Sequence, residues 1–377
     1  MENQSNKLKV MTIFGTRPEI IRLSRIMIKL DKYVNHIMVH TGQSYDYEMN
    51  EVFFKDLDLR KPDHFLGVKS DTIGGQIANL FLKGEPVIKA ENPDAILILG
   101  DTNSALLAIL AKRFKIPIFH LEAGNRCFDE NVPEETNRKI VDHISDINLP
   151  YTEHSRRYLI GEGVHPGTIY VTGTPLREVF ESYQDKVATS NILMELNLTP
   201  KGYFLVSAHR EENVENNNKF QNLIDSLNAI AMKYNQPVIV TTHPRTRKRL
   251  EQGSYEINDK INFAKPFGYL DYIKLQQNAR CVITDSGSIQ EEAAIIGFNA
   301  VQIRTVSERP EAFETGNVIL AGVQKDGVLL AIDTAIRQVE AGEKFQIPNE
   351  YKESNVSGKV VRLIIGLAKI IKDKKYD

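Results

Sequence analysis

Carboxylate side chains in the first half of the chain stand where strand-like segments end. Asp101 follows one apolar run and Glu122 follows the next. Glu134 and its neighbour Glu135 come directly after a proline. Taken singly, each carboxylate is typical of a helix cap or a turn. Together they suit acid–base chemistry, because burial and mutual repulsion at one edge of a sheet tune carboxyl pKa values.

Imidazole and guanidinium groups follow two strand-like runs in the second half. His209 is followed by Arg210, and His243 stands in His-Pro-Arg. An imidazole changes charge near neutral pH, and a guanidinium attracts anions. This half therefore adds a proton carrier and cations to the candidate chemistry.

The segment 284–292, Thr-Asp-Ser-Gly-Ser-Ile-Gln-Glu-Glu, is a candidate diphosphate site. Its small residues let backbone amides approach a phosphate, its hydroxyls add donors, and a carboxylate one turn along the helix can reach ribose hydroxyls. The residues concerned are Ser286, Gly287, Ser288 and Glu292. The alternative interpretation is a helix capping box made by Ser288 and Glu291, and both can hold.

Arg-Pro-Glu occurs at 17–19 and again at 309–311, each time after a strand-like run and before a helix-like one. In the first copy a glycine permits a tight turn, proline suits the first helical position, and Arg17 projects from the junction. Arg309 has the same place in the second copy. A well-capped helix is the simpler alternative for the first copy, and the two copies are expected to serve similar ends.

Several cofactor and metal classes lack their motifs. The chain has no Gly-x-Gly-x-x-Gly and no Walker loop, which argues against NAD and ATP. It has no His-Glu-x-x-His, and its Asp-Leu-Asp triplet at 56–58 closes a helical pattern, which favours a surface turn over a metal site. The only cysteines, Cys127 and Cys281, are predicted to be free thiols. We expect no cofactor and no metal.

The elements that position these residues follow from alternation of β-branched runs with helical patterns. Such alternation predicts βαβ units, parallel sheets and an α/β fold. In parallel sheets, ligands bind beyond the carboxyl ends of the strands, where the candidate residues stand. The predicted strands are 8–14, 37–40, 95–99, 116–120, 168–171, 203–207, 237–242, 280–284 and 300–303.

The length of 377 residues predicts two domains. A polar stretch at 181–190 separates the two groups of strands. We expect an N-terminal domain over 1–180, a C-terminal domain over 191–358, and a helix over 359–377 that packs back on the N-terminal domain.

Charge and hydropathy narrow the class. The formal net charge is -2, so no overall positive field attracts nucleic acid or an anionic membrane. The N-terminus does not follow the plan of a signal peptide, and no run of 18 apolar residues occurs. A cytoplasmic protein with no nucleic-acid or membrane partner is expected.

Nine short blocks, in order, resemble the non-hydrolysing UDP-N-acetylglucosamine 2-epimerase family. They are GTRPE (15–19), TGQ (41–43), GDT (100–102), HLEAGNR (120–126), PEETNR (133–138), AHREEN (208–213), THP (242–244), TDSGSIQEE (284–292) and SERPEA (307–312). The resemblance spans nearly the whole chain.

That resemblance implies two Rossmann-like domains facing across a cleft, a fold of the glycosyltransferase-B type, with UDP held mainly by the C-terminal half. It also implies a homodimer and C2 epimerisation by anti elimination of UDP and its re-addition through a 2-acetamidoglycal. The catalytic residues it implies are Asp101, Glu122, Glu134 and His209. The substrate-binding residues are Arg17, Arg138, His243, Ser286, Gly287, Ser288, Glu292 and Arg309.

Departures from the usual family blocks indicate a branch. Leu-Arg-Thr is replaced by Asn-Arg-Cys at 125–127, Ser-Gly-Gly by Ser-Gly-Ser at 286–288, and Gln-His by Gln-Ser at 43–44. With Tyr-Asp-Tyr at 45–47 and Asn-Val-Ser at 355–357, these changes resemble the capsule and O-antigen branch that makes UDP-N-acetyl-L-fucosamine from UDP-2-acetamido-2,6-dideoxy-β-L-talose.

Alternatives remain open. One is an ordinary UDP-N-acetylglucosamine 2-epimerase. Another is a UDP-sugar glycosyltransferase of the same fold, because fold alone does not set function. A third is a catalytically silent nucleotide-sugar sensor, in which the phosphate loop would be kept while the carboxylates were free to vary.

Overall fold

A computed structural model describes residues 7–42, 47–208, 210 and 216–375. His209 and the 43–46 segment, both singled out above, lie outside the described residues. The chain forms two compact units: unit 1 comprises 1–182 and 352–377, and unit 2 comprises 183–351. The division after 182 falls within the polar stretch at 181–190, and the division after 351 lies before residue 358.

Unit 1 is built on a parallel six-stranded sheet in the order β3-β2-β1-β4-β5-β6. This is the order of a doubly wound, Rossmann-like sheet. The described strands are β1 (Lys9–Phe14), β2 (Asn35–His40), β3 (His64–Phe65), β4 (Ala95–Leu99), β5 (Ile118–Leu121) and β6 (Ile147–Leu149). The central strands are buried on both faces, as continuous apolar runs require.

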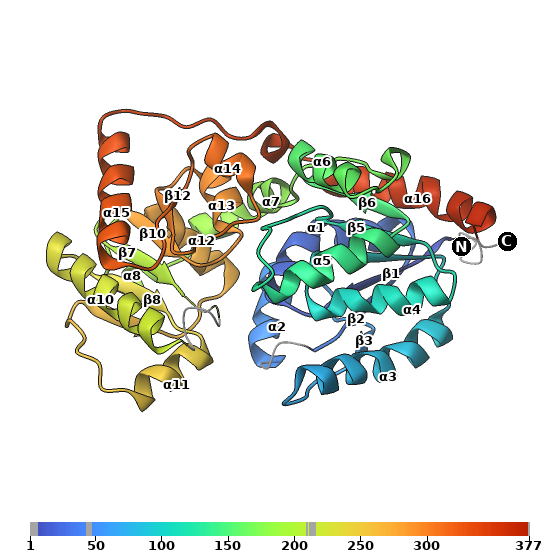
Figure 1. Ribbon diagram of the computed structural model, residues 1–377, viewed down its shortest axis with the longest axis horizontal. Coiled ribbons are helices and arrows are strands. Elements are labelled where there is room, and N and C mark those ends of the chain that lie inside the picture. The colour runs from blue at the N-terminus through green and yellow to red at the C-terminus, as the bar shows by residue number, and fades with distance from the viewer. Residues whose placement is uncertain (1–6, 43–46, 209, 211–215, 376–377) are drawn as a thin grey trace. The chain divides into compact units, whose positions relative to one another are not determined.

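Helices cover both faces of this sheet (Figure 1). The helices of unit 1 are α1 (Arg17–Tyr33), α2 (Tyr47–Asp56), α3 (Ile73–Glu91), the 3₁₀ turn η2 (Asn103–Leu107), α4 (Ala108–Arg113), α5 (Pro133–Ile144), α6 (Glu153–Gly161), η3 (Pro166–Thr168) and α16 (Val356–Lys375). The helix α7 (Leu176–Ala188) contains the division between the units after residue 182. The apolar side of α3, η2 and α4 meets strand residues such as Ile13 and Ile96 in one core.

The C-terminal helix α16 belongs to unit 1, although unit 2 precedes it in the chain. It packs against α1 and is the red helix labelled α16 in Figure 1. Its start is held by Glu178, whose carboxylate accepts hydrogen bonds from the Ser357 amide at 2.8 Å and from the Ser357 hydroxyl. Near its end, the Lys375 ammonium lies 3.1 Å from the Asp146 carboxylate.

Unit 2 repeats the topology, with strand order β12-β11-β10-β7-β8-β9. Its strands are β7 (Phe204–Ser207), β8 (Val238–Thr241), β9 (Ile261–Ala264), β10 (Cys281–Thr284), β11 (Ala300–Gln302) and β12 (Ile319–Leu320). Its helices are α8 (Ile192–Glu195), α10 (Asn217–Tyr234), α11 (Pro244–Gln252), α12 (Tyr269–Asn278), α13 (Ile289–Ile296), α14 (Pro310–Glu314), α15 (Lys325–Glu340) and η4 (Asn349–Lys352). The predicted α/β class with two Rossmann-like domains is confirmed.

The predicted strand at 168–171 is wrong. The segment begins at the last residue of η3 and then forms a single isolated bridge, between Ile169 and Asn148 of β6. The short strands β3, β6, β9 and β12 were not predicted. They are the edge strands of the two sheets, and each is short and paired with a neighbour on one side only.

Candidate functional site

The carboxyl edge of the unit 1 sheet is shaped by three residues with left-handed backbone. Gly100 follows β4 with φ +70°, and Glu122 follows β5 with φ +67°, two residues before Gly124 at +79°. A non-glycine residue in this region costs on the order of 1 kcal/mol or more and persists only where its surroundings hold it. The backbone at Glu122 is therefore fixed by its contacts. The first of these is the hydrogen bond that its backbone amide donates to the Leu149 carbonyl.

Asp101 is held by an arginine from α5. One carboxylate oxygen lies 2.7 Å from Nε of Arg138, and Nη1 of Arg138 lies 2.7 Å from Glu135. Arg138 is buried, so the guanidinium is a fixed cation. The Asp101 carbonyl also accepts a hydrogen bond from the Asn137 amide at 2.9 Å. The structure thus brings two of the predicted residues, Asp101 and Arg138, into direct contact.

Glu122 is gripped at both oxygens. Nη1 of Arg22, from α1, lies 2.8 Å from Oε2, and the Asn125 amide donates to Oε1 at 3.1 Å. Arg22 and Asn125 are both buried. The carboxylate therefore has a defined orientation at the end of β5.

Two further predicted residues stand at helix starts in unit 1. Arg17 is the first residue of α1, and its guanidinium lies over the Phe53 ring at 5.7 Å. Glu134 lies in the first turn of α5 and is half-buried. Arg17 follows β1, and α5 reaches the end of β4 through the bond from the Asn137 side chain to the Asp101 carbonyl. The ends of β1 and β4, which are neighbours with diverging crossovers, form the usual ligand position in such folds.

In unit 2 the predicted phosphate loop joins β10 to α13. The hydroxyls of Ser286 and Ser288 are 3.0 Å apart, and the Asp285 carboxylate accepts the Arg210 amide at 3.0 Å. A Cβ atom added at Gly287 would lie 2.2 Å from Oε1 of Glu308. The loop is therefore closely packed, and a side chain at 287 would require the Glu308 carboxylate to move.

The capping-box alternative for this loop is wrong. Ser288 is the N-cap of α13, but its side chain makes no capping hydrogen bond. Glu291 is fully buried and forms an ion pair with Arg309 at 3.0 Å. Glu292 accepts a hydrogen bond from the Gln276 amide. The serine hydroxyls are thus not committed to the helix cap.

The remaining predicted residues of unit 2 stand on neighbouring connections. Arg309 is the N-cap of α14 after β11, and its ion pair with Glu291 ties it to the phosphate-loop helix. His243 follows β8 and is exposed.

Comparison with known proteins identifies the family. A family model described as UDP-N-acetylglucosamine 2-epimerase matches residues 27–365. The structure of UDP-N-acetylglucosamine 2-epimerase from Rickettsia bellii is 45% identical, covers 98% of this chain and 100% of its own, and superposes with a TM-score of 0.92. The chain belongs to this epimerase family. It is therefore a UDP-sugar 2-epimerase, an isomerase.

Two other relatives of the epimerase differ in the ligands they are named for. The Methanocaldococcus jannaschii UDP-GlcNAc 2-epimerase, in complex with UDP-GlcNAc and UDP, is 33% identical with a TM-score of 0.87, covering 95% of this chain and 100% of its own. The UDP-2,3-diacetamido-2,3-dideoxy-D-glucuronate 2-epimerase of Pseudomonas aeruginosa is 33% identical over 87% of this chain and 92% of its own. Overall identity thus does not separate substrates.

The sequence reasoning missed several residues that hold the candidate site together. Arg22 and Asn125 hold Glu122, and Glu19 joins two loops by accepting the Thr16 amide at 2.7 Å and the Thr102 hydroxyl at 2.9 Å. Burial raises the pKa of the Glu19 carboxyl to about 7, and its hydrogen bonds oppose the shift. A charged residue on the apolar face of α1 was the available signal for Arg22 and Glu19.

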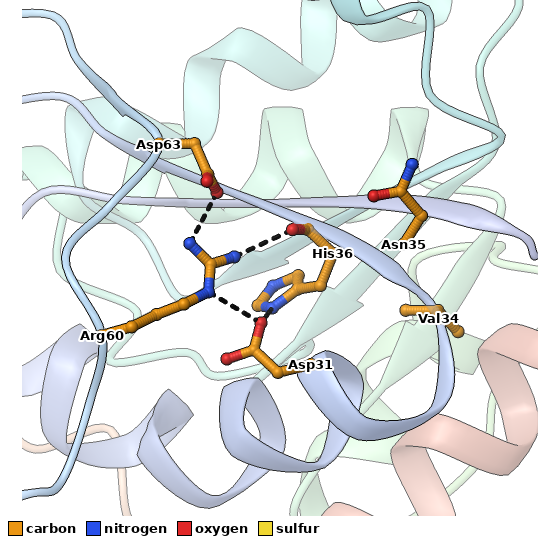
Figure 2. A pocket seen from close by; sticks show the side chains of 6 residues that line it. All are labelled: Asp31, Val34, Asn35, His36, Arg60 and Asp63. Carbon is orange, nitrogen blue, oxygen red and sulfur yellow. Dashed lines mark hydrogen bonds and ion pairs between the residues drawn. The ribbon is translucent and has the colours of Figure 1, made fainter. Parts of the chain in front are cut away.

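One hollow of the epimerase lies at the wrong end of its sheet. It has a volume of about 480 Å³ and is lined by Asp31, Val34, Asn35, His36, Arg60 and Asp63. Figure 2 shows Arg60 bridging Asp31 and Asp63 at the start of β2, whereas the candidate residues follow strand ends. Its charged groups pair with one another, and these pairs tie the loop that carries Arg60 to the start of β2.

In the described part of the chain, no helix is long and apolar enough to cross a membrane.

Proposed function

We propose that the epimerase inverts C2 of a UDP-2-acetamido sugar by elimination and re-addition of UDP. The observation that carries this proposal is the set of oriented carboxylates at the carboxyl edge of unit 1. Asp101 and Glu122 stand at the ends of adjacent strands, each fixed by a buried arginine. Such groups suit a reaction that moves protons at a poorly acidic carbon.

The reaction divides into two balanced steps. A base removes the C2 proton, the C2–H electron pair becomes the C1=C2 double bond, and the bond from C1 to the phosphate oxygen breaks with its electrons leaving on UDP. In the return step, UDP oxygen attacks C1 while a proton is delivered to the opposite face of C2. Proton removal and delivery on opposite faces call for more than one acid–base group.

We assign the proton transfers to Asp101, Glu122, Glu134 and His209, without dividing acid from base among them. Arg17 and Arg138 would orient the substrate beside them. UDP would be held by Ser286, Gly287, Ser288, Glu292, His243 and Arg309. Donors and cations at the diphosphate stabilise the charge that develops as UDP leaves.

For the substrate we favour UDP-2-acetamido-2,6-dideoxy-β-L-talose, giving UDP-N-acetyl-L-fucosamine for capsule or O-antigen synthesis. Asn125 supports this choice, because it departs from the usual family leucine and donates to Glu122. The departure therefore bears on a carboxylate to which we assign proton transfer. The alternative is UDP-N-acetylglucosamine, epimerised to UDP-N-acetylmannosamine. We further propose that the enzyme is a cytoplasmic homodimer.

A panel of UDP-2-acetamido sugars in deuterium oxide, without an acceptor, tests the proposal. The product is expected to carry deuterium at C2, which NMR detects. Exchange should be fastest with the L-talo substrate. Faster exchange with UDP-N-acetylglucosamine would select the alternative. Release of UDP only with an acceptor, without C2 exchange, would indicate a transferase instead.

Variants of the carboxylates test the residue roles. Asp101→Asn and Glu122→Gln should each lower the exchange rate by about 10²-fold or more while UDP binding, measured by calorimetry, stays close to wild type. Glu181→Gln is the control, because this carboxylate on α7 is exposed and forms an ion pair with Arg177 at 2.7 Å. Full exchange in either site variant would remove that residue from the mechanism.

A further inference from the structure

His120 lies at the centre of a buried ion network beneath the carboxyl edge of the unit 1 sheet. Its Nδ1 is 2.8 Å from Oδ1 of Asp142, and its Nε2 is 2.8 Å from the Gly100 carbonyl oxygen. Both side chains have at most 1% of their surface exposed. The ring thus links α5 to the turn that carries Asp101.

Both partners of the ring can only accept hydrogen bonds. A carbonyl oxygen never donates, and Asp142 is held as a carboxylate by Nη1 of Arg126 at 2.7 Å and by the Gly124 amide at 3.1 Å. A neutral imidazole carries a single N–H and cannot serve two acceptors. Two acceptors at 2.8 Å therefore require the doubly protonated, positively charged ring.

Neighbouring charges favour the doubly protonated form of the His120 ring. The ionised groups around the ring are Glu122 and Arg126 in the loop after β5, Asp142 on α5, Glu162 after α6, and Arg22 on α1. Three carboxylates thus face two guanidinium groups, and one positive charge on the ring makes the network neutral. Across Gly100, Arg138 pairs with both Asp101 and Glu135, so one guanidinium faces two carboxylates there, which also favours a positive charge on the ring.

The titration of His120 agrees with this geometry. Burial by itself lowers the pKa of the imidazole, but the hydrogen bond to Asp142 and the charge of that carboxylate outweigh it. The bond to Gly100 and the charge of Glu122 raise the pKa further. The net direction is upward from the ordinary value.

We propose that His120 is a permanently charged positioning residue of the epimerase, which holds the Gly100 carbonyl and supports the negative charge of Glu122. Gly100 needs its left-handed backbone to turn Asp101 out of β4, and the ring bonds the carbonyl of that turn. Glu122 stands two residues beyond the ring on the same strand end. The proposal rests on the acid–base roles given to Asp101 and Glu122.

A comparable histidine provides a control. His36 is also buried and pairs with a carboxylate, Asp31, at 2.7 Å. Its other nitrogen faces the Thr12 hydroxyl at 2.9 Å, a group that can donate as well as accept. The neutral ring can satisfy this site, which lies at the start of β2, away from the candidate residues.

The charge is tested on the wild-type chain by NMR of ¹⁵N-labelled histidine. His120 is expected to show two protonated ring nitrogens at about pH 7.5, where an ordinary imidazole with a pKa near 6.5 is mostly neutral. A single N–H at neutral pH would overturn the proposal. This measurement needs no variant and is independent of activity.

The positioning role is tested with His120→Gln and the control His36→Gln. His120→Gln should lower kcat for C2 exchange by about 10- to 100-fold with KM nearly unchanged, because displaced acid–base groups slow the chemical step. The acidic limb of kcat/KM should also move to higher pH, since Glu122 loses a neighbouring cation. A packing defect alone would lower the rate equally at every pH.

The outcomes separate the two proposals. Wild-type rates and an unmoved pH profile in folded His120→Gln, or an equal loss in His36→Gln, would overturn the role of His120. No C2 exchange in the wild type, with His120 still doubly protonated, would instead overturn the proposed function. If His120→Gln fails to fold, the NMR result on the wild type decides the charge.

Discussion

Guanidinium groups from helices orient the carboxylates on loops to which we assign proton transfer. Arg138 of α5 holds Asp101, and Arg22 of α1 holds Glu122. A rigid helix fixes the cation, and the charge-assisted bond then restricts the carboxylate rotamer. Proton transfer depends on such preorganisation, because small displacements of a reacting group reduce the rate sharply.

Gly287 provides a prediction at the residue scale. Gly287→Ala should weaken UDP binding by about 10-fold, because the new Cβ would overlap Oε1 of Glu308, which Arg304 holds through its other oxygen at 2.9 Å. Isothermal titration with UDP measures the change. Shortening the side chain in Gly287→Ala/Glu308→Asp should restore part of the affinity. Gly366→Ala, with open space around its Cβ, is the control; unchanged affinity in Gly287→Ala would contradict the prediction.

At the scale of elements, the helix α16 is held to unit 1 by specific polar contacts. Glu178 bonds the amide and hydroxyl of Ser357, and Lys29 donates to the Asn355 side chain at 3.0 Å. These are residues of the Asn-Val-Ser block that pointed to the L-fucosamine branch. The block therefore anchors a helix and carries less information about the sugar than Asn125 does.

Removing the anchor should loosen α16. Glu178→Ala is expected to destabilise the docked helix by about 1–3 kcal/mol, because the buried Ser357 amide loses its partner. Hydrogen exchange over 356–375 measures the local opening. Glu181→Ala, on the exposed side of α7, should leave exchange unchanged; equal protection in both variants would show that Glu178 does not hold the helix.

On the scale of the whole molecule, the two units share one strand order but not one arrangement of loops. Arg17 follows β1, the first strand of unit 1, whereas Arg309 follows β11, the fifth strand of unit 2. The two Arg-Pro-Glu copies are therefore not topologically equivalent. Their resemblance reflects local helix-start chemistry more than a duplicated binding element.

Glu19 predicts how the stability of the molecule varies with pH. Its carboxyl pKa is about 7 in the folded chain, above the ordinary 4.5, so the stability it contributes is fully present below about pH 4.5 and lost as pH rises through 7. The buried carboxylate should cost up to about 3 kcal/mol above that pH. Glu19→Gln, neutral throughout, should lose this dependence while keeping the acceptor for the Gly15 and Thr16 amides.

The effect is measured by urea unfolding at pH values from 5 to 8. Hydrogen exchange over 9–33 monitors the unfolding. The informative quantity is the free energy of unfolding of wild type minus that of Glu19→Gln at each pH. It should fall as pH rises, whereas the difference between wild type and Glu181→Gln should stay flat. A constant difference for Glu19→Gln would contradict the buried, neutral carboxyl.

The α/β class, the two Rossmann-like domains and the family could be predicted from the sequence. Buried parallel strands need apolar runs, loops at strand ends need small and polar residues, and both leave local patterns in the chain. The short edge strands and the false strand at 168–171 could not be predicted in this way. Pairing with a neighbouring strand decides whether such a segment becomes a strand. Partners of the candidate residues were also invisible locally: Arg22 and Glu122 are 100 positions apart. Crossovers between strands bring α1 beside the end of β5, and only the tertiary structure decides which charge meets which.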